Sequence, residues 1–157
     1  MLSKPEYGWS DFKLEGTSVY DLSYLDDIAF EWIDQAIYGL KTMQPFCVKG
    51  CLEPRRFLCM VSYWNCHIII EDDGPQLLDD EDIIVEYSHT NMLEFCKYLH
   101  KDISENVGEW VRFVDYSYEE DDAFFENKEV VLRERLKTLE CLILSHERDF
   151  SAGSYFF

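Results

Sequence analysis

The first clear periodic pattern along the chain is helical and lies between residues 26 and 40. Apolar residues recur there at the three- and four-residue spacing of one helix face: Ile28, Trp32, Ile33, Ala36, Ile37 and Leu40. Asp26 or Asp27 stands at the start of this pattern and carries a side chain that caps helix N-termini. Gly39 lies near its end, where a helix terminator is expected. We therefore predict a helix from Asp26 or Asp27 to about Leu40, with its apolar face in the core.

Short runs with the composition of β-strands follow this helix. Three of them are rich in β-branched and aromatic residues and are separated by short polar or turn-forming segments: Phe46–Leu52, Phe57–Tyr63 and Cys66–Glu71. Strands joined by such short connections pair in antiparallel fashion, which predicts a three-stranded meander. Ile83–Tyr87 is expected to add a fourth strand, and a weaker signal indicates a further short strand near Phe12–Leu14.

A second helix is predicted to begin at Thr90 or Asn91. Glu94 is the third residue after an Asn91 cap, so the two side chains have the spacing of a capping box. Gly108 is expected to break this helix before the segment Trp110–Val114, whose secondary structure the pattern leaves open.

The last helix is predicted from about Glu126 to His146, where an apolar stripe runs along one side and charges alternate in sign along the other. No repeat and no flexible linker divides the chain, so we expect residues 1–157 to form a single globular domain. The predicted fold class is α+β: an antiparallel β-meander of three to five strands packed with about three α-helices. The aromatic end, Tyr155-Phe156-Phe157, is expected to dock on the domain or contact a partner.

The composition is that of a folded, soluble chain. Of 157 residues, 47% are hydrophobic and 16% aromatic, which is enough to build a core. No apolar run approaches the ~20 residues of a membrane helix, and the opening MLSKPEYGWSDF lacks the apolar stretch of a secretory leader. The six cysteines do not have the spacing of a small secreted domain, so we expect reduced thiols and a cytoplasmic location.

The net charge of −18 is concentrated in the middle of the chain. Residues 71–126 contain 18 acidic and 3 basic side chains, whereas residues 127–157 contain five of each. Scattered acidic residues would serve solubility and keep the free chain monomeric. Bunched acidic residues repel one another, and an opposing basic surface would relieve that repulsion. We therefore expect a chain that is monomeric when free and that binds a basic protein, and neither nucleic acid nor an anionic membrane.

Two acidic runs make up most of this excess, and both are expected to lie in surface loops. One is Glu71-Asp72-Asp73 with Asp79-Asp80-Glu81-Asp82, and the other is Glu119-Glu120-Asp121-Asp122. Aromatic residues interleave with the second run, and an aromatic ring beside a carboxylate suits Arg or Lys, which can pair and stack at once. The candidate partner-binding residues are Asp79, Asp80, Glu81, Asp82, Trp110, Asp115, Tyr118, Glu119, Glu120, Asp121 and Asp122.

Four cysteines fall in the predicted sheet and raise the question of a zinc site: Cys47, Cys51, Cys59 and Cys66. Structural zinc sites take close ligand pairs on turns and need two such pairs. Cys47 and Cys51 are instead expected on one face of a strand, and no second close pair exists. We interpret these cysteines as small core residues and predict neither a metal nor a cofactor.

The chain also lacks the usual signatures of catalysis. Its four histidines lie in no recognisable nucleophile motif, and acidic surroundings raise a thiol pKa, which disfavours the reactive thiolate. The stretch 71–82 has Pro75 and Leu77 where an EF-hand needs oxygen ligands. No P-loop, G-x-G-x-x-G or G-x-S-x-G motif is present. We predict that the protein is not an enzyme.

The first half of the chain resembles the immunity proteins of bacterial toxin systems, including those of contact-dependent growth inhibition. The segment Ser23-Tyr24-Leu25-Asp26-Asp27-Ile28, the helix after it and the following meander carry this resemblance. It implies a stoichiometric inhibitor that covers the active site of a toxin, in particular a nuclease. Nuclease toxins are basic because they bind nucleic acid, so an acidic inhibitor suits them electrostatically.

Two alternatives remain open at this point. The acidic face also suits a DNA mimic that inhibits a nucleic-acid-binding enzyme, which would hold many such proteins rather than one. An enzyme of unrecognised type is the other alternative, since a fold without motifs does not exclude catalysis.

Overall fold

The computed structural model describes residues 1–72, 83–117 and 121–151, with side chains as far as Asp149. The described elements are β1 (Trp9–Phe12), β2 (Tyr20–Ser23), α1 (Ile28–Thr42), β3 (Phe46–Cys51), β4 (Arg55–Val61), β5 (Cys66–Asp72), β6 (Ile84–Ser88), α2 (Met92–Ser104), α3 (Val107–Val111) and α4 (Asp122–Ser151). Residues 73–82, where an acidic loop is expected, and the aromatic end at residues 152–157 lie outside the described residues.

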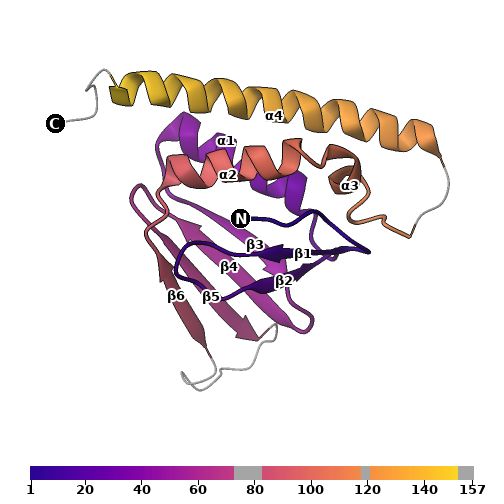
Figure 1. Ribbon diagram of the computed structural model, residues 1–157, viewed down its shortest axis with the longest axis horizontal. Helices are drawn as coiled ribbons and strands as arrows, with labels where there is room; N and C mark the ends of the chain where they lie inside the picture. Colours follow the sequence, from indigo (N-terminus) through magenta and orange to yellow (C-terminus); the bar gives the residue numbers. More distant parts are fainter. Residues whose placement is uncertain (73–82, 118–120, 152–157) are drawn as a thin grey trace.

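The main sheet is the predicted antiparallel meander, with strand order β3-β4-β5-β6. A separate two-stranded sheet, β1-β2, lies in front of it in Figure 1, and α4 lies across α1 and α2 above both sheets. These two antiparallel sheets and the described helices confirm the α+β fold class. β2 was not predicted, and the strand that was weakly signalled near Phe12–Leu14 lies earlier, at Trp9–Phe12.

The inner face of the main sheet holds the core. Register places Val48, Cys59 and Ile68 side by side on this face, and all three are buried. The central ring above them is Trp32 of α1, stacked at 6.1 Å on Phe57 of β4. The buried apolar residues of these strands occupy every second position, and they face the helices and the β1-β2 hairpin.

The outer face of the main sheet is open to solvent among the residues that the structure describes. Register aligns Lys49, Leu58, Ile69 and Val85 across its middle, and Val85 is 61% exposed. Leu58 and Ile69 are half-buried by their neighbours. The sheet thus has one face in the core and one uncovered face with an apolar centre.

The β1-β2 hairpin is fastened to the edge of the main sheet by Glu86 of β6. The Glu86 carboxylate accepts hydrogen bonds from the Ser18 backbone N–H at 3.0 Å, the Ser18 hydroxyl at 2.7 Å and the Tyr20 hydroxyl at 2.5 Å. Burial, helped by the Glu86 carboxylate, raises the pKa of Tyr20 to about 12. Glu86 therefore joins the edge of one sheet to the turn of the other.

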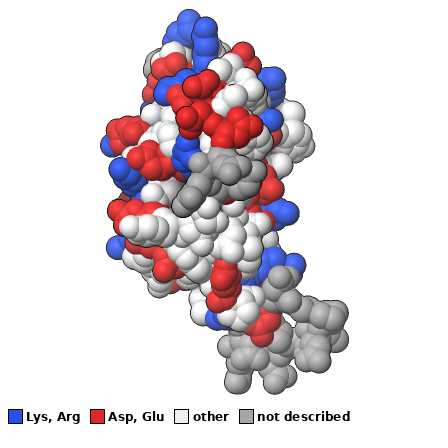
Figure 2. All heavy atoms as spheres, turned by 90° about the vertical axis from the view of Figure 1, so that its right-hand side faces the viewer, with Lys and Arg blue, Asp and Glu red and all other residues white. Residues whose placement is uncertain are grey.

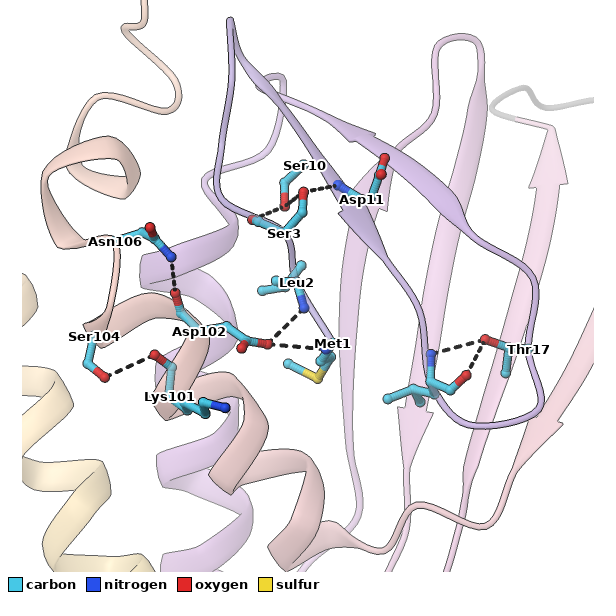
Figure 3. Close-up of polar contacts among 11 residues, drawn as sticks. Met1, Leu2, Ser3, Ser10, Asp11, Thr17, Lys101, Asp102, Ser104 and Asn106 are labelled. Carbon is cyan, nitrogen blue, oxygen red and sulfur yellow. Dashed lines mark hydrogen bonds and ion pairs between the residues drawn. The ribbon is translucent and has the colours of Figure 1, made fainter.

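Asp102 of α2 anchors the first residues of the chain. Its Oδ2 accepts a hydrogen bond from the Leu2 backbone N–H at 2.9 Å and lies 3.3 Å from the Met1 nitrogen (Figure 3). The Ser3 hydroxyl in turn accepts the Asp11 backbone N–H at 2.9 Å, which ties this segment to β1. The segment before β1 is thus held between the hairpin and α2.

Helix boundaries follow capping chemistry, with corrections at two glycines. The capping box of Asn91 and Glu94 is present as predicted. Gly39 does not end α1, because α1 continues to Thr42 and its C-cap is Met43 in the left-handed region (φ +52°). Gly39 instead makes room for Phe46, since a Cβ there would clash with that ring. Gly108 does not break α2, which ends at Ser104, and lies inside α3.

The ends of the acidic runs belong to regular elements rather than to loops. Glu71 and Asp72 are the last residues of β5, where Arg56 and Arg55 lie opposite them in β4 and form ion pairs with them. Cross-strand neighbours of opposite charge stabilise a strand whose composition alone disfavours it. Asp122 begins α4 four residues earlier than predicted, because a carboxylate is favourable at a helix N-terminus.

Among the described residues, no helix is long and apolar enough to cross a membrane.

Candidate partner-binding surface

The predicted site residues divide into three groups. Asp115, Asp121 and Asp122 lie at the surface around the start of α4. Trp110 is a correction: its side chain is fully buried beside Phe113, so it is a core residue and offers no contact to a partner. The remaining predicted residues lie outside the described residues: Asp79, Asp80, Glu81, Asp82, Tyr118, Glu119 and Glu120.

The fold brings the start of α1 next to Asp115, although 88 residues separate Asp27 from it. Asp27 occupies the N-cap position of α1, yet its side chain makes no capping hydrogen bond. Its Oδ2 instead lies 3.5 Å from the Lys128 ammonium of α4, and Asp115 Oδ2 lies 3.9 Å from the same nitrogen. One lysine therefore holds two carboxylates from separate parts of the chain.

The three charged groups are partly buried, which weakens the stabilisation of their charges by water. The Lys128 side chain is only 16% exposed, and its ammonium lies 5.2 Å from the centre of the Phe30 ring. Burial raises the pKa of the Asp27 carboxyl, Lys128 opposes that rise, and negative Asp115 adds to it. Burial also raises the pKa of Glu31 in the first turn of α1; Lys49 opposes that rise, and Asp26 and Asp27 add to it. The acidic charge here exceeds what the nearby cation neutralises.

The first turn of α4 adds further acidic groups. Asp121 has a left-handed backbone (φ +72°), and its Oδ1 accepts a long hydrogen bond of 3.4 Å from the Phe124 N–H. Asp122 is almost fully exposed, and its Oδ1 lies 3.7 Å from an Arg112 nitrogen. That guanidinium lies 4.0 Å from the centre of the Phe125 ring. Arg112 thus shows within this chain how a cation contacts a carboxylate and a ring together.

Aromatic residues border these carboxylates; among them Tyr24 is half-buried and the others are exposed. Tyr24 and Tyr116 make an edge-to-face contact at 5.0 Å between ring centres. Both rings press against Gly8, where a Cβ would lie 2.6 Å from Tyr116. Tyr7, on the same turn, is 85% exposed, and Phe124 of α4 is half-exposed.

We call these residues the acidic–aromatic surface: Asp26, Asp27, Asp115, Asp121 and Asp122 with Tyr7, Tyr24, Tyr116 and Phe124. Figure 2 faces the side of the molecule where α4 begins and shows red acidic atoms gathered in its upper half, with blue basic atoms among them and a pale area below. Sequence reasoning identified Asp115 to Asp122 from their charge. It missed the contribution of Asp26, Asp27, Tyr7 and Tyr24, because no local pattern shows that these segments meet residue 115.

The sheet separates the cysteines that suggested a metal site. Cys47 and Cys51 lie on its outer face, whereas Cys59 and Cys66 are buried on its inner face. Burial and neighbouring Cys66 raise the pKa of the Cys96 thiol, which keeps it protonated. Within the described ranges, no three His, Cys, Asp or Glu side chains come together as metal ligands would.

No family model, curated protein or solved structure matches this chain.

A second pair of carboxylates lies on the β1-β2 hairpin. Asp11 and Asp21 are directly opposite in the register. A hydrogen bond that protonated Asp21 donates to the Asp11 carboxylate, together with burial and the Asp11 charge, raises the pKa of Asp21 above its usual value of 3.8. Like charges directly opposite across two strands destabilise a hairpin.

We expect Asp21→Asn to raise the free energy of unfolding at pH 7 by a few tenths of a kcal/mol, because it removes this repulsion. The advantage should vanish as the pH falls through the raised pKa, since protonated Asp21 no longer repels Asp11 and the native state of the original protein gains stability there. Urea denaturation at pH 7 and pH 4 measures both effects. The pKa of Glu86 is lowered, so Glu86 contributes to the pH dependence of the unfolding free energy with the opposite sign. This contribution is the same in the variant and in the original protein, so it cancels when the two are compared at each pH. Glu15→Gln, on the exposed hairpin loop, is the control. A gain equal at both pH values would contradict the explanation.

Proposed function

We propose that this protein binds and neutralises a basic protein, and that it acts in the cytoplasm as an immunity protein against a basic toxin, with a nuclease as the favoured target. The observation that carries the proposal is the convergence of three separate acidic segments, around Asp27, Asp115 and Asp122, on one surface bordered by exposed aromatic rings.

The chemistry of this surface favours Arg and Lys side chains. Carboxylates with few nearby cations attract a basic protein over about 10 Å at 0.1 M salt. Aromatic rings beside them add stacking for guanidinium groups once the two proteins touch. Tyr and Trp are also the residue types that most often dominate binding energy at interfaces.

The same surface favours a single protein partner over general mimicry of DNA. A mimic would present a regular array of negative charges, whereas Lys128 and Arg112 lie among the carboxylates here. A mixed pattern of this kind fits one complementary surface better than many.

Capture from an extract of the source cell by the immobilised protein tests the proposal. We expect one basic protein bound one-to-one, with its enzymatic activity inhibited in the complex. Release of many DNA-binding proteins by free DNA would favour the mimic instead. Recovery of no basic protein would contradict the proposed function.

We expect the double substitution Asp122→Lys with Glu126→Lys to slow association with the captured basic protein about tenfold at low salt, because charge near the site steers the encounter. Stopped-flow rates for this variant measure the effect. The control, Glu134→Lys with Glu140→Lys, makes the same change of charge at exposed positions farther along α4. Equal slowing by both pairs would show that net charge alone governs binding, and rates that are unaffected by salt would contradict the electrostatic account.

A further inference from the structure

The uncovered outer face of the main sheet differs chemically from the rest of this acidic molecule. Its middle row is apolar except at one end, where Lys49 stands in β3. The row on one side contains Met60, His67 and Tyr87, of which Met60 is 40% exposed. Leu58 and Ile69 at the centre are half-buried, and Leu58 lines a hollow with residues of α1.

Charge on this face is close to balanced, although the whole chain has a net charge of −18. On the other side of the middle row, Arg56 lies opposite Glu71 and pairs with it. With Lys49, the described residues of these rows contain two cations and one carboxylate, and Glu31 and Asp34 of α1 add two carboxylates at the β3 margin. Two copies of the chain therefore meet the least like-charge repulsion here, whereas copies that meet through the acidic–aromatic surface repel each other.

We propose that this outer face binds a second copy of the chain, as a two-fold sandwich of the two main sheets. This proposal departs from the expectation that the free chain is monomeric, and it does not depend on the proposed function. A two-fold axis along the middle row places Ile69 and Val85 against their own counterparts. It also places His67 of each copy opposite Glu71 of the other, which is a complementary pair.

The same axis keeps the acidic ends of the two sheets apart. β5 ends at Asp72 and β6 begins at Ile84, both at the Glu71 end of the sheet. Strands that face each other in opposite directions put these two ends on opposite sides of the sandwich. Lys49 meets its counterpart at the β3 margin, where its exposed ammonium remains in water.

The size of the face sets the strength of the dimer. Four strands about 4.8 Å apart and five to seven residues long give a face of roughly 400 Å². A stable specific interface covers about 800 Å² on each partner. The dimer should therefore be weak and depend on concentration, and salt should strengthen it by screening the repulsion between two acidic chains.

Sedimentation equilibrium of the full chain, from about 10 μM to about 1 mM and at about 0.05 and 0.5 M NaCl, tests the proposal. We expect an average mass that rises above the monomer value of 18.7 kDa with concentration, and more so at high salt. Salt therefore acts here in the direction opposite to its effect on a basic partner, so the two proposals can fail separately. A monomeric mass under all these conditions overturns the proposal.

Val85→Lys distinguishes this face from general charge effects. The substitution makes the net charge less negative, which would strengthen self-association through any other surface. In the proposed dimer, however, it places two lysines opposite each other. We expect the dissociation constant to rise about tenfold or more. Val130→Lys on α4 is the matched control, since Val130 is exposed to 57% against 61% for Val85 and the charge changes equally. Far-UV circular dichroism confirms that both variants fold. Equal dissociation constants for the two variants overturn the proposal.

Discussion

Replacement of Trp32 with alanine is expected to lower the free energy of unfolding by about 4 kcal/mol, which is the largest single effect that we predict. Trp32 is fully buried between the sheet and α2, with its ring 5.6 Å from Phe12 and 6.3 Å from Phe95. Its indole N–H also donates a hydrogen bond of 2.8 Å to the Lys49 carbonyl at the edge of β3. The substitution removes the ring around which three elements pack.

Urea denaturation followed by far-UV circular dichroism measures this loss, since the signal does not depend on the tryptophan removed. Trp32→Phe separates the two contributions, because it keeps a ring and loses only the hydrogen bond, at about 1 kcal/mol plus a small packing term. Trp64→Ala is the matched control, because Trp64 is largely exposed on the β4-β5 turn and should cost less than about 0.5 kcal/mol. Similar losses at positions 32 and 64 would contradict the placement of the core.

Lys128→Met is expected to destabilise the protein by about 2 kcal/mol at pH 7, because it leaves Asp27 and Asp115 without their shared cation. A fully buried pair would lose more, but both side chains retain some contact with water. Methionine keeps an unbranched stem over Phe30, so the change removes charge more than packing.

The pH dependence identifies the cause of this loss. The pKa of Asp27 is already raised by burial and should rise further without Lys128. The native variant then binds its proton more tightly than the unfolded chain, so its stability recovers as the pH falls from 7 toward 5. Asp27→Asn should restore part of the loss in the Lys128→Met background at pH 7. Lys137→Met, at an exposed lysine of the same helix, is the control, and a loss independent of pH would contradict the account.

Local patterns predicted the elements whose signals lie within a few residues. The capping box at Asn91 and the alternation in β3 to β5 are signals of this kind. β2 was missed because its four residues depend on distant partners: Tyr20 packs on Phe57, and Leu22 lies over Gly50. A short strand fixed by tertiary contacts has no local signature.

The candidate surface was predictable in its charge but not in its arrangement. The run that ends at Asp121 and Asp122 stands out in the sequence, whereas the approach of Asp27 to Asp115 depends on how α1 packs against α4. The burial of Trp110 could not be predicted from the sequence either, because a helix of five residues is too short for its pattern to show which side faces inward. Aromatic residues that alternate with acidic ones give the same sequence pattern whether their rings lie in the core or bind a partner.

The hydrogen bond from Leu2 to Asp102 spans 100 residues, and it has a consequence for the order in which the protein folds during synthesis. Strands β3 to β6 pair with their neighbours in sequence, so they can form while translation continues. The segment around Leu2 leaves the ribosome well before them, yet its binding site on α2 is completed only after residue 102 has emerged. This early segment is therefore among the last parts of the fold to reach its native position, and during that interval its apolar residues are exposed to chaperones.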